Sequence, residues 1–235
     1  MHIRKARYIA LCFVAAGMFL ATGCKYLKAP SNQERQAIPE TANQNEEQAK
    51  LNQQFEAMVS EDSARTEMTL TKYSKANSYS DILGNFEKDV ATRENAIVSA
   101  KSMPQTFSPK LRQGFVELLV AENDLAHATG LMYEKERDMA VERQQVNEWT
   151  EHLNAGWSPN ATQRALLEHE TELARAVNEA PSAAESVLAC LDKTAKTEAA
   201  FESTASRQSV PYSPPAAKLH DIIRSEASAL SRGPH

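Results

Sequence analysis

The chain contains little glycine, and it lacks the alternating apolar and polar pattern of β-strands. Seven of its 235 residues are glycine, so a glycine-rich loop that cradles phosphate and a backbone oxyanion nest are not expected. No alternating pattern of four or more residues occurs, whereas Ala, Glu, Gln, Leu and Lys are plentiful. This composition predicts an all-α protein.

Common motifs of nucleophilic and metal-dependent catalysis are also missing. The sequence has no Gly-x-Ser-x-Gly, no His-Glu-x-x-His, and no Ser-x-x-Lys accompanied by Lys-Thr-Gly. Each of these motifs places a nucleophile or a metal ligand beside its base, and none of those arrangements is available here. We therefore expect a protein without enzymatic activity.

The histidines do not form a recognisable metal-binding pattern. The Glu-x-x-His pair that binds metal ions inside some helical bundles is absent, and its closest approximation is Asp124-x-x-His127. His169 stands between Glu168 and Glu170, but adjacent residues on a helix point about 100° apart and do not share a ligand. The haem attachment motif Cys-x-x-Cys-His is missing too. No metal ion and no cofactor is predicted.

The first residues have the features of an export signal. His2 to Arg7 includes three cations and no acid, and Tyr8 to Leu20 is almost wholly apolar. About thirteen helical residues span about 20 Å, less than the roughly 30 Å hydrocarbon core of a bilayer. A basic start, a short apolar segment and small residues after it are typical of a cleaved signal.

The stretch Leu20-Ala21-Thr22-Gly23-Cys24 resembles the lipobox of bacterial lipoproteins, and the resemblance covers only the start of the chain. It implies signal cleavage after Gly23 and a lipid on Cys24. The family usually has Leu, Val or Ile where this chain has Ala21. Lys25 follows the cysteine, where Asp retains some lipoproteins in the inner membrane, so a Gram-negative organism would place this protein in the outer membrane, facing the periplasm. An ordinary secretory signal or an uncleaved anchor remains an alternative.

The mature chain would be acidic and would have one cysteine. Removing residues 1–23 takes away three cations and leaves 23 Lys and Arg against 31 Asp and Glu, a net charge of −8. This charge argues against binding to nucleic acid or anionic lipid, so the acyl chains on Cys24 would hold the protein to the membrane. Because Cys12 leaves with the signal, no intrachain disulfide is expected. We interpret Cys190 as a small buried apolar residue, with a reactive or intermolecular thiol as the alternative.

Residues 24–45 are polar and contain two prolines. Such a segment buries too little apolar surface to fold alone, so it is predicted to be a flexible tether. Apolar periodicity then predicts a helix from about Glu46 to Tyr73. A second helix is expected to begin after an N-cap at Ser80 and to stop before Pro104.

A long third helix is the clearest feature of the sequence. Ser108-Pro109 supplies an N-cap and a first-turn proline, and Asn154-Ala155-Gly156 supplies a glycine terminator. About 46 residues would span about 70 Å. A strict seven-residue repeat predicts packing against a partner helix with slight supercoiling; its apolar positions are Leu111, Leu118, Leu125, Met132, Met139, Val146 and Leu153.

The companion positions of this repeat are mostly polar, which favours a bundle over a two-stranded coiled coil. They are Phe115, Glu122, Thr129, Glu136, Arg143 and Thr150. We expect the charged members to be solvated; alternatively they determine partner choice or register.

Ser158-Pro159 repeats the helix start, and the short preceding turn predicts an antiparallel hairpin. Pro181 is expected to interrupt this fourth helix, with Ser182 and Glu185 forming a capping box that restarts it. The helical bundle is therefore predicted over residues 46–206.

Residues 207–235 are expected to form a Pro-rich linker and a short C-terminal helix opened by Ser213-Pro214. Trp157 lies at the tip of the predicted hairpin. It is either an exposed contact for a partner or a packing residue that folds back near Leu153.

The sequence thus predicts an elongated all-α bundle with a long antiparallel, coiled-coil-like hairpin. We expect a lipid-anchored scaffold or adaptor of the cell envelope that binds a protein partner or itself. Two alternatives stay open: a bundle that binds a small ligand or a metal ion, and a self-assembling coiled coil that spaces the membrane from the cell wall.

Overall fold

The computed structural model describes residues 32–76, 78–215 and 217–233, with side chains from residue 44 onwards. The predicted signal, Gly23 and Cys24 lie outside the described residues. The chain divides into two units, Met1–Asn43 and Gln44–His235, and the second unit contains the bundle. No helix in the described part of the chain combines the length and the apolar character needed to cross a membrane.

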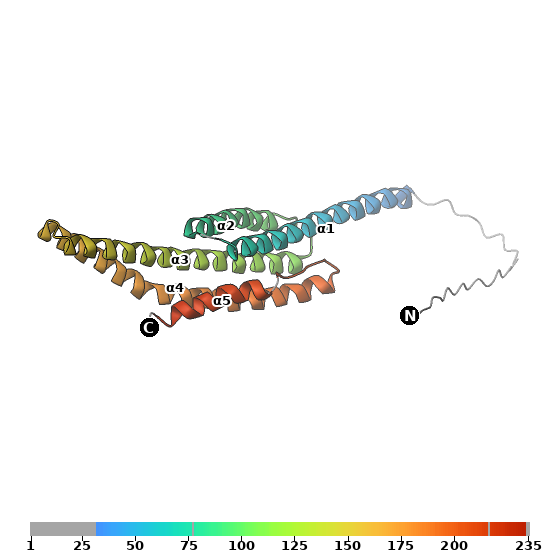
Figure 1. Ribbon diagram of the computed structural model, residues 1–235. Coiled ribbons are helices and arrows are strands. Elements are labelled where there is room, and N and C mark those ends of the chain that lie inside the picture. The colour runs from blue at the N-terminus through green and yellow to red at the C-terminus, as the bar shows by residue number, and fades with distance from the viewer. Residues whose placement is uncertain (1–31, 77, 216, 234–235) are drawn as a thin grey trace, which may run out of the picture. The chain divides into compact units, whose positions relative to one another are not determined.

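The fold is all-α, as predicted, and the two longest helices form an antiparallel hairpin (Figure 1). Shorter helices pack along part of that hairpin, mainly α2 against α3 and α5 against α4. The five helices are α1 (Asn32–Tyr73), α2 (Tyr79–Lys101), α3 (Pro109–Asn154), α4 (Pro159–Arg207) and α5 (Ala217–Ser231).

Local signals produce the hairpin where the sequence predicted it. Ser108 Oγ accepts a hydrogen bond from the Leu111 N–H at 3.5 Å, and proline occupies the first turn of α3. Gly156 has φ +80°, a left-handed conformation that glycine adopts without steric cost. α4 begins directly after Ser158, although the Ser158 side chain makes no capping hydrogen bond.

The N-terminal helices differ from the prediction at both of their starts. α1 begins at Asn32 and not at Glu46, so the expected flexible tether is helical from Asn32 onwards. Ala, Gln and Glu are abundant there, and these residues have high helix propensity. The segment can therefore be helical although its sequence has no apolar face. The N-cap of α2 is Ser78 and not Ser80, because the Asp81 N–H donates to Ser78 Oγ at 3.2 Å.

Pro181 does not divide the fourth helix, which was another expectation. α4 runs through it as one element. Proline removes one backbone hydrogen bond, but Ala180, Ala184 and Val187 on either side are buried in the core. Packing of these turns offsets the local cost and keeps the helix continuous.

The C-terminal helix starts later than expected. α5 begins at Ala217, so Ser213-Pro214 belong to the preceding linker and do not open the helix. Its apolar side lies in the same core as α3 and α4, through Leu219, Ile223 and Ala227.

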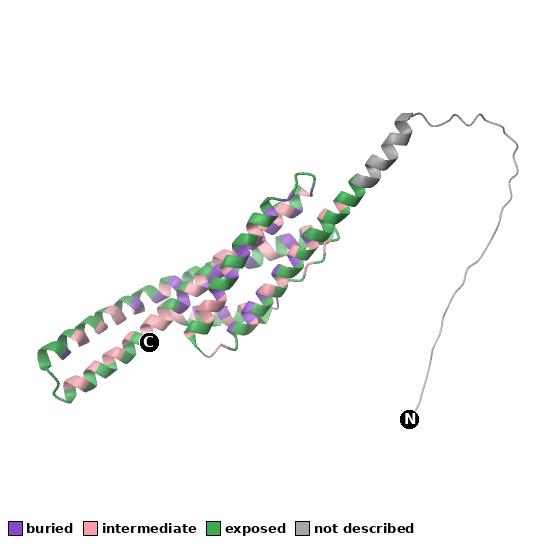
Figure 2. Ribbon diagram, turned by 90° about the horizontal axis from the view of Figure 1, so that it is seen from above, coloured by how far each residue is buried: buried purple, intermediate pink, exposed green. Residues whose placement is uncertain are grey.

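Two apolar clusters fill the bundle. One is aromatic: the Phe55 ring centroid lies 4.8 Å from that of Phe107 and 5.3 Å from that of Phe115. The other joins Met132, Leu191 and residues of α5. Figure 2 shows buried residues where several helices run together, whereas the far end of the α3–α4 hairpin is mostly exposed or partly buried.

Candidate functional site

A buried arginine lies between three helices. Arg93, on α2, is only 1% exposed. Its Nη1 donates to Asp89 Oδ2, one helical turn earlier, at 2.7 Å, and its Nη2 donates to Thr66 Oγ1 of α1 at 2.7 Å. Both donor–acceptor distances are typical of hydrogen bonds from a charged donor.

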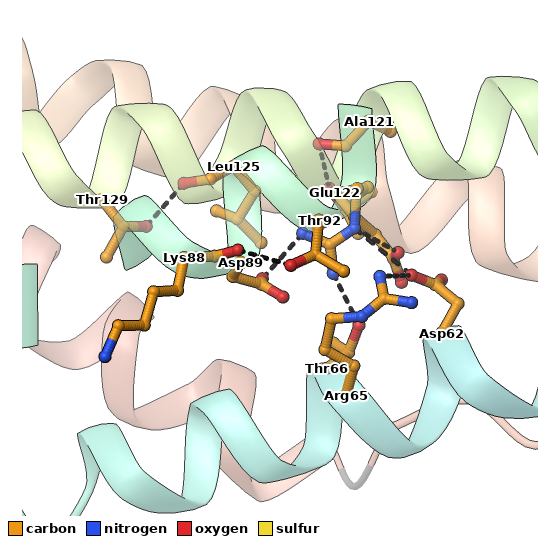
Figure 3. Close-up of polar contacts among 12 residues, drawn as sticks. Asp62, Arg65, Thr66, Lys88, Asp89, Thr92, Ala121, Glu122, Leu125 and Thr129 are labelled. Carbon is orange, nitrogen blue, oxygen red and sulfur yellow. Dashed lines mark hydrogen bonds and ion pairs between the residues drawn. The ribbon is translucent and has the colours of Figure 1, made fainter. Parts of the chain in front are cut away.

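Two further carboxylates complete what we call the Arg93 cluster: Asp62, Thr66, Asp89, Arg93 and Glu122. Arg93 Nε lies 3.2 Å from Glu122 Oε2 of α3 and 3.4 Å from Asp62 Oδ1 of α1. These two contacts are ion pairs without hydrogen-bond geometry at Nε. Figure 3 shows Asp62, Thr66 and Glu122 converging between the three helices.

The cluster contains more acids than cations. Asp62 also pairs with Arg65 Nη1 at 2.9 Å, so three carboxyl groups face two guanidinium groups. Burial raises the pKa of Glu122 well above its usual value, and the negative charge of Asp62 raises it further against the attraction of Arg93.

Arg93 itself stays charged despite its burial. Burial lowers its pKa, but the charges of Glu122, Asp62 and Asp89 together outweigh this effect and raise it. A buried guanidinium is tolerated when it is paired and hydrogen-bonded, and removing one partner of such a group is costly. The Arg93 cluster therefore joins α1, α2 and α3 in one register.

A half-buried acid lies near this cluster, on α4. Burial, followed by repulsion from Glu202, raises the pKa of Glu198 to about 7. The Tyr212 hydroxyl from the linker is buried and has no hydrogen-bond partner among the described residues. Burial, and then the charges of Glu122 and Glu198, raises the pKa of that phenol.

The Arg93 cluster has no room for a substrate. The cavity beside it has a volume of about 20 Å³ and is lined by Thr66, Asp89, Arg93, Glu122 and the α5 residue His220, among others. That volume is enough for about one water molecule. The Arg93 cluster is therefore a structural ion cluster. The open surfaces of the bundle are better candidates for binding.

The neighbouring side of α2 forms such an open surface. We call it the α2–α3 groove: a hollow of about 640 Å³ with an apolar interior, whose walls come from α2 and α3, with Ser186 added from α4. Phe86 is buried at its base, Leu83 and Val90 are half-buried, and Leu131 is 48% exposed. Val90 and Glu94 directly follow Asp89 and Arg93 in sequence, so their side chains point about 100° away from the Arg93 cluster. Phe86 lines both the groove and the small cavity beside the cluster.

The rim of the groove is acidic. Glu87 and Glu94 of α2 and Glu134 of α3 line it, all three are exposed, and no Lys or Arg lines it. His127 is the remaining titratable lining residue. An apolar interior with a rim of one charge sign is the usual composition of a surface that binds an apolar partner with complementary charge.

The predicted solvated seam is only partly solvated. Glu122 is 5% exposed, because α1 and α2 cover it through Asp62 and Arg93, so that expectation is wrong for this residue. Glu136 is half-buried, and Arg143 is exposed as expected. The difference follows the extent of α1 and α2, which cover only the first half of α3.

The predicted contact residue Trp157 lies at the hairpin tip and is 56% exposed. Its ring stacks on His152, with centroids 3.9 Å apart and planes 8° apart. The backbone N–H of Trp157 also donates to the His152 carbonyl oxygen at 3.1 Å. Trp157 therefore folds back onto the last turn of α3 while one side stays open.

Cys190 is half-buried against the core, and burial raises the pKa of its thiol, which matches the apolar interpretation. Within the described part of the chain, no three side chains of His, Cys, Asp or Glu lie together so that they could bind a metal ion.

Sequence reasoning missed Arg93 altogether. Asp89 and Arg93 are spaced as an i, i+4 pair, which is usually an exposed helix pair. Phe86, Val90 and Ile97 recur at helical spacing along α2 and indicate its apolar side, but a charged residue on that side gives no signal of its own. Only the Asp62 and Glu122 carboxylates from other helices account for its burial.

Comparison with known proteins adds no relative. No family model, no curated protein and no solved structure matches this chain.

Proposed function

We propose that this protein is a lipid-anchored helical scaffold or adaptor of the cell envelope, without catalytic activity, that binds a protein partner in the α2–α3 groove. The observation that carries the proposal is the groove itself. It is open and apolar with an acidic rim, whereas the Arg93 cluster is closed and its charges are paired with one another.

The groove favours a particular partner chemistry. It follows α2 from Leu83 to Glu94, about three helical turns, and side chains of α3 form its other wall. An amphipathic helix inserts its apolar face into such a groove. Lys or Arg beside that face would meet Glu87, Glu94 and Glu134, which would raise the association rate and select against acidic partners.

The anchor belongs to the same proposal and is supported by the lipobox resemblance at Cys24. Tethering to a membrane raises the local concentration of the bundle for any partner in the same compartment. The anchor and the groove are separable, so each has its own test.

Site-specific photocrosslinking in intact cells tests the groove. A photoreactive amino acid replaces Leu131 inside the groove or, as a matched control, Val141 further along α3, which is 49% exposed. We expect an adduct from position 131 whose crosslinked peptide, identified by mass spectrometry, is a basic amphipathic helix. The reversals Glu87→Lys and Glu134→Lys together should reduce that adduct at least about fivefold. Equal adducts from both positions, or an adduct insensitive to the rim charges, would contradict the proposal.

Metabolic labelling tests the anchor. Cys24→Ser should abolish incorporation of labelled palmitate and leave an unprocessed chain, while Cys190→Ser should leave labelling unchanged. Labelling that persists in the Cys24→Ser variant would refute lipidation at this residue.

A further inference from the structure

A second hollow lies beside the turn that joins α1 to α2, at a different place from the α2–α3 groove. Its volume is about 530 Å³, within the range of small-ligand pockets. Segments far apart in the sequence build it: the end of α1, the turn, the start of α2, the middle of α3, and α5. We call it the tyrosine pocket, after the lining residues Tyr73, Tyr79, Tyr133, Glu136 and Glu226.

The charged groups of this pocket are all acids. Glu136 comes from α3 and Glu226 from α5, and no Lys, Arg or His lines the pocket. Among the described residues, neither carboxylate has an ion-pair partner. Asp62 and Asp89, by contrast, both pair with Arg93.

The hydroxyl groups of two tyrosines orient one of these acids. Tyr73 and Tyr133 are both buried, and each donates a hydrogen bond to the same oxygen, Oε2, of Glu226. A phenol is a neutral donor at ordinary pH, so these bonds position the carboxylate without cancelling its charge. Two donors on one oxygen leave the other oxygen for a further partner.

Aromatic rings surround the acids. The Tyr73 and Tyr133 ring centroids lie 5.2 Å apart with planes tilted by 52°, and half-buried Tyr79 adds a third ring to the lining. Aromatic faces attract cations through their quadrupole, most strongly where water is partly excluded. Rings and carboxylates in one hollow therefore favour the same kind of ligand.

Burial disfavours the ionised form of the two carboxylates, and a cationic ligand would offset this effect. Removal from water raises the pKa of Glu136 and that of Glu226. The negative charge of Glu136 also raises the pKa of Tyr73 and Tyr79, after the larger effect of burial. A cation in the pocket would stabilise the ionised form of both acids.

We propose that the tyrosine pocket binds a small organic cation, an aliphatic amine whose ammonium group lies between Glu136 and Glu226 and against the tyrosine rings. The donor set favours this class over a metal ion, because the described residues provide only two carboxylates here and no site with three metal-ligating side chains. It favours an amine over a neutral ligand because the charges are of one sign and unpaired. This inference does not depend on the proposed partner in the α2–α3 groove.

Titration calorimetry on the purified full chain tests the proposal, with 1,4-diaminobutane as the probe. Butane-1,4-diol is its neutral counterpart of equal length. We expect the diamine to bind and the diol not to bind at the same concentrations. Glu136→Gln should weaken diamine binding at least about tenfold, since a hydrogen bond to a charged group is lost. Glu148→Gln, an exposed acid on the same helix that lines neither hollow, is the matched control and should leave affinity unchanged.

A second variant keeps the test independent of folding. Tyr79→Leu removes a half-buried ring without touching either carboxylate, and should weaken the diamine severalfold while the circular dichroism spectrum stays that of the parent. The proposal is overturned if the diamine does not bind at millimolar concentration, if the diol binds equally, or if the two glutamine variants bind alike. Binding of Ca²⁺ or Mg²⁺ in place of the diamine, lost in Glu136→Gln, would also overturn it and reassign the pocket to a metal ion.

Discussion

The two halves of α3 have the same sequence repeat and different environments. Leu111, Leu118, Leu125 and Met132 are all buried. Met139, Val146 and Leu153 continue the seven-residue step but are only half-buried. α4 accompanies both halves, whereas α1 and α2 accompany only the first (Figures 1 and 2).

The two halves show that an apolar repeat does not by itself determine how deeply its residues are buried. A heptad pattern requires only one partner helix, and α4 provides it along the whole of α3. Full burial requires a third and fourth helix, and those are present only up to about Tyr133. The outer half of the hairpin is therefore held only by contacts between α3 and α4, such as the half-buried hydrogen bond that joins His169 Nδ1 and Glu142 Oε2 at 2.7 Å.

The first half of α3, which α1 and α2 cover, also contains the buried charges. Arg93 and Glu122 lie where α1, α2 and α3 meet, and Glu198 lies on the neighbouring part of α4. The outer half has no buried charged residue among those described. Disrupting the Arg93 cluster should therefore destabilise the packing around the first half of α3 and leave the outer half of the hairpin unchanged.

The largest expected effect comes from Arg93→Met. It would leave Asp62, Asp89 and Glu122 in the core without their central cation, and removing one partner of a buried ion pair costs about 3–5 kcal/mol. Urea denaturation followed by circular dichroism measures the free energy of unfolding. Adding Asp89→Asn and Glu122→Gln should recover part of the loss, because fewer unpaired charges remain. A loss below about 1 kcal/mol in the single variant would show that the cluster does not hold the three helices together.

A matched leucine pair tests the comparison of the two halves directly. Leu118→Ala removes a fully buried side chain and should cost about 2–5 kcal/mol. Leu153→Ala removes a half-buried side chain from the same seven-residue series and should cost less than about 1 kcal/mol, in proportion to the smaller area it buries. Equal losses from the two variants would mean that a further partner covers the outer half of the hairpin in solution.

The smallest expected effect is a pH dependence from Glu198. Its pKa in the folded protein, about 7, lies above the ordinary value of 4.5, so the folded state binds this proton more tightly. The free energy of unfolding should therefore be highest below about pH 4.5 as far as this group is concerned, and should fall as the pH rises through 7. Because solvent reaches part of this carboxyl group, we expect a change of only about 1 kcal/mol.

The Glu198→Gln variant isolates that contribution, since Glu122 shifts in the same direction and remains in both proteins. The variant should be more stable than the parent at pH 8 and should lose less stability between pH 5 and pH 8. Glu185→Gln, an exposed acid on the same helix, serves as the control and should follow the parent curve. Identical curves for the parent and Glu198→Gln would refute the raised pKa.

Much of the fold could be predicted, because helix ends depend on neighbouring residues. Ser108, Pro109 and Gly156 fix the start of α3 and the hairpin turn through local hydrogen bonds and backbone conformation. The N-cap of α2 was misplaced because Ser78 and Ser80 are both good caps. Pro181 was misjudged because tertiary packing of the surrounding alanines outweighs its local effect.

The candidate sites could not be predicted in the same way. Glu122 was expected to be solvated, and Arg93 was not singled out, because each depends on side chains from other helices for its burial. The α2–α3 groove and the tyrosine pocket likewise combine residues separated by many turns of helix. Their lining residues carry no spacing that a single segment would reveal.

The sequence by itself determined that this protein is helical, where its hairpin turns, and which positions of α3 are apolar. These properties depend on propensity, capping and periodicity, which act over a few residues. The tertiary structure alone decided how deeply each position is buried, that Arg93 and Glu122 are core residues, and where the surface is hollow. Burial depends on which distant helices lie alongside, and here α1 and α2 end partway along α3.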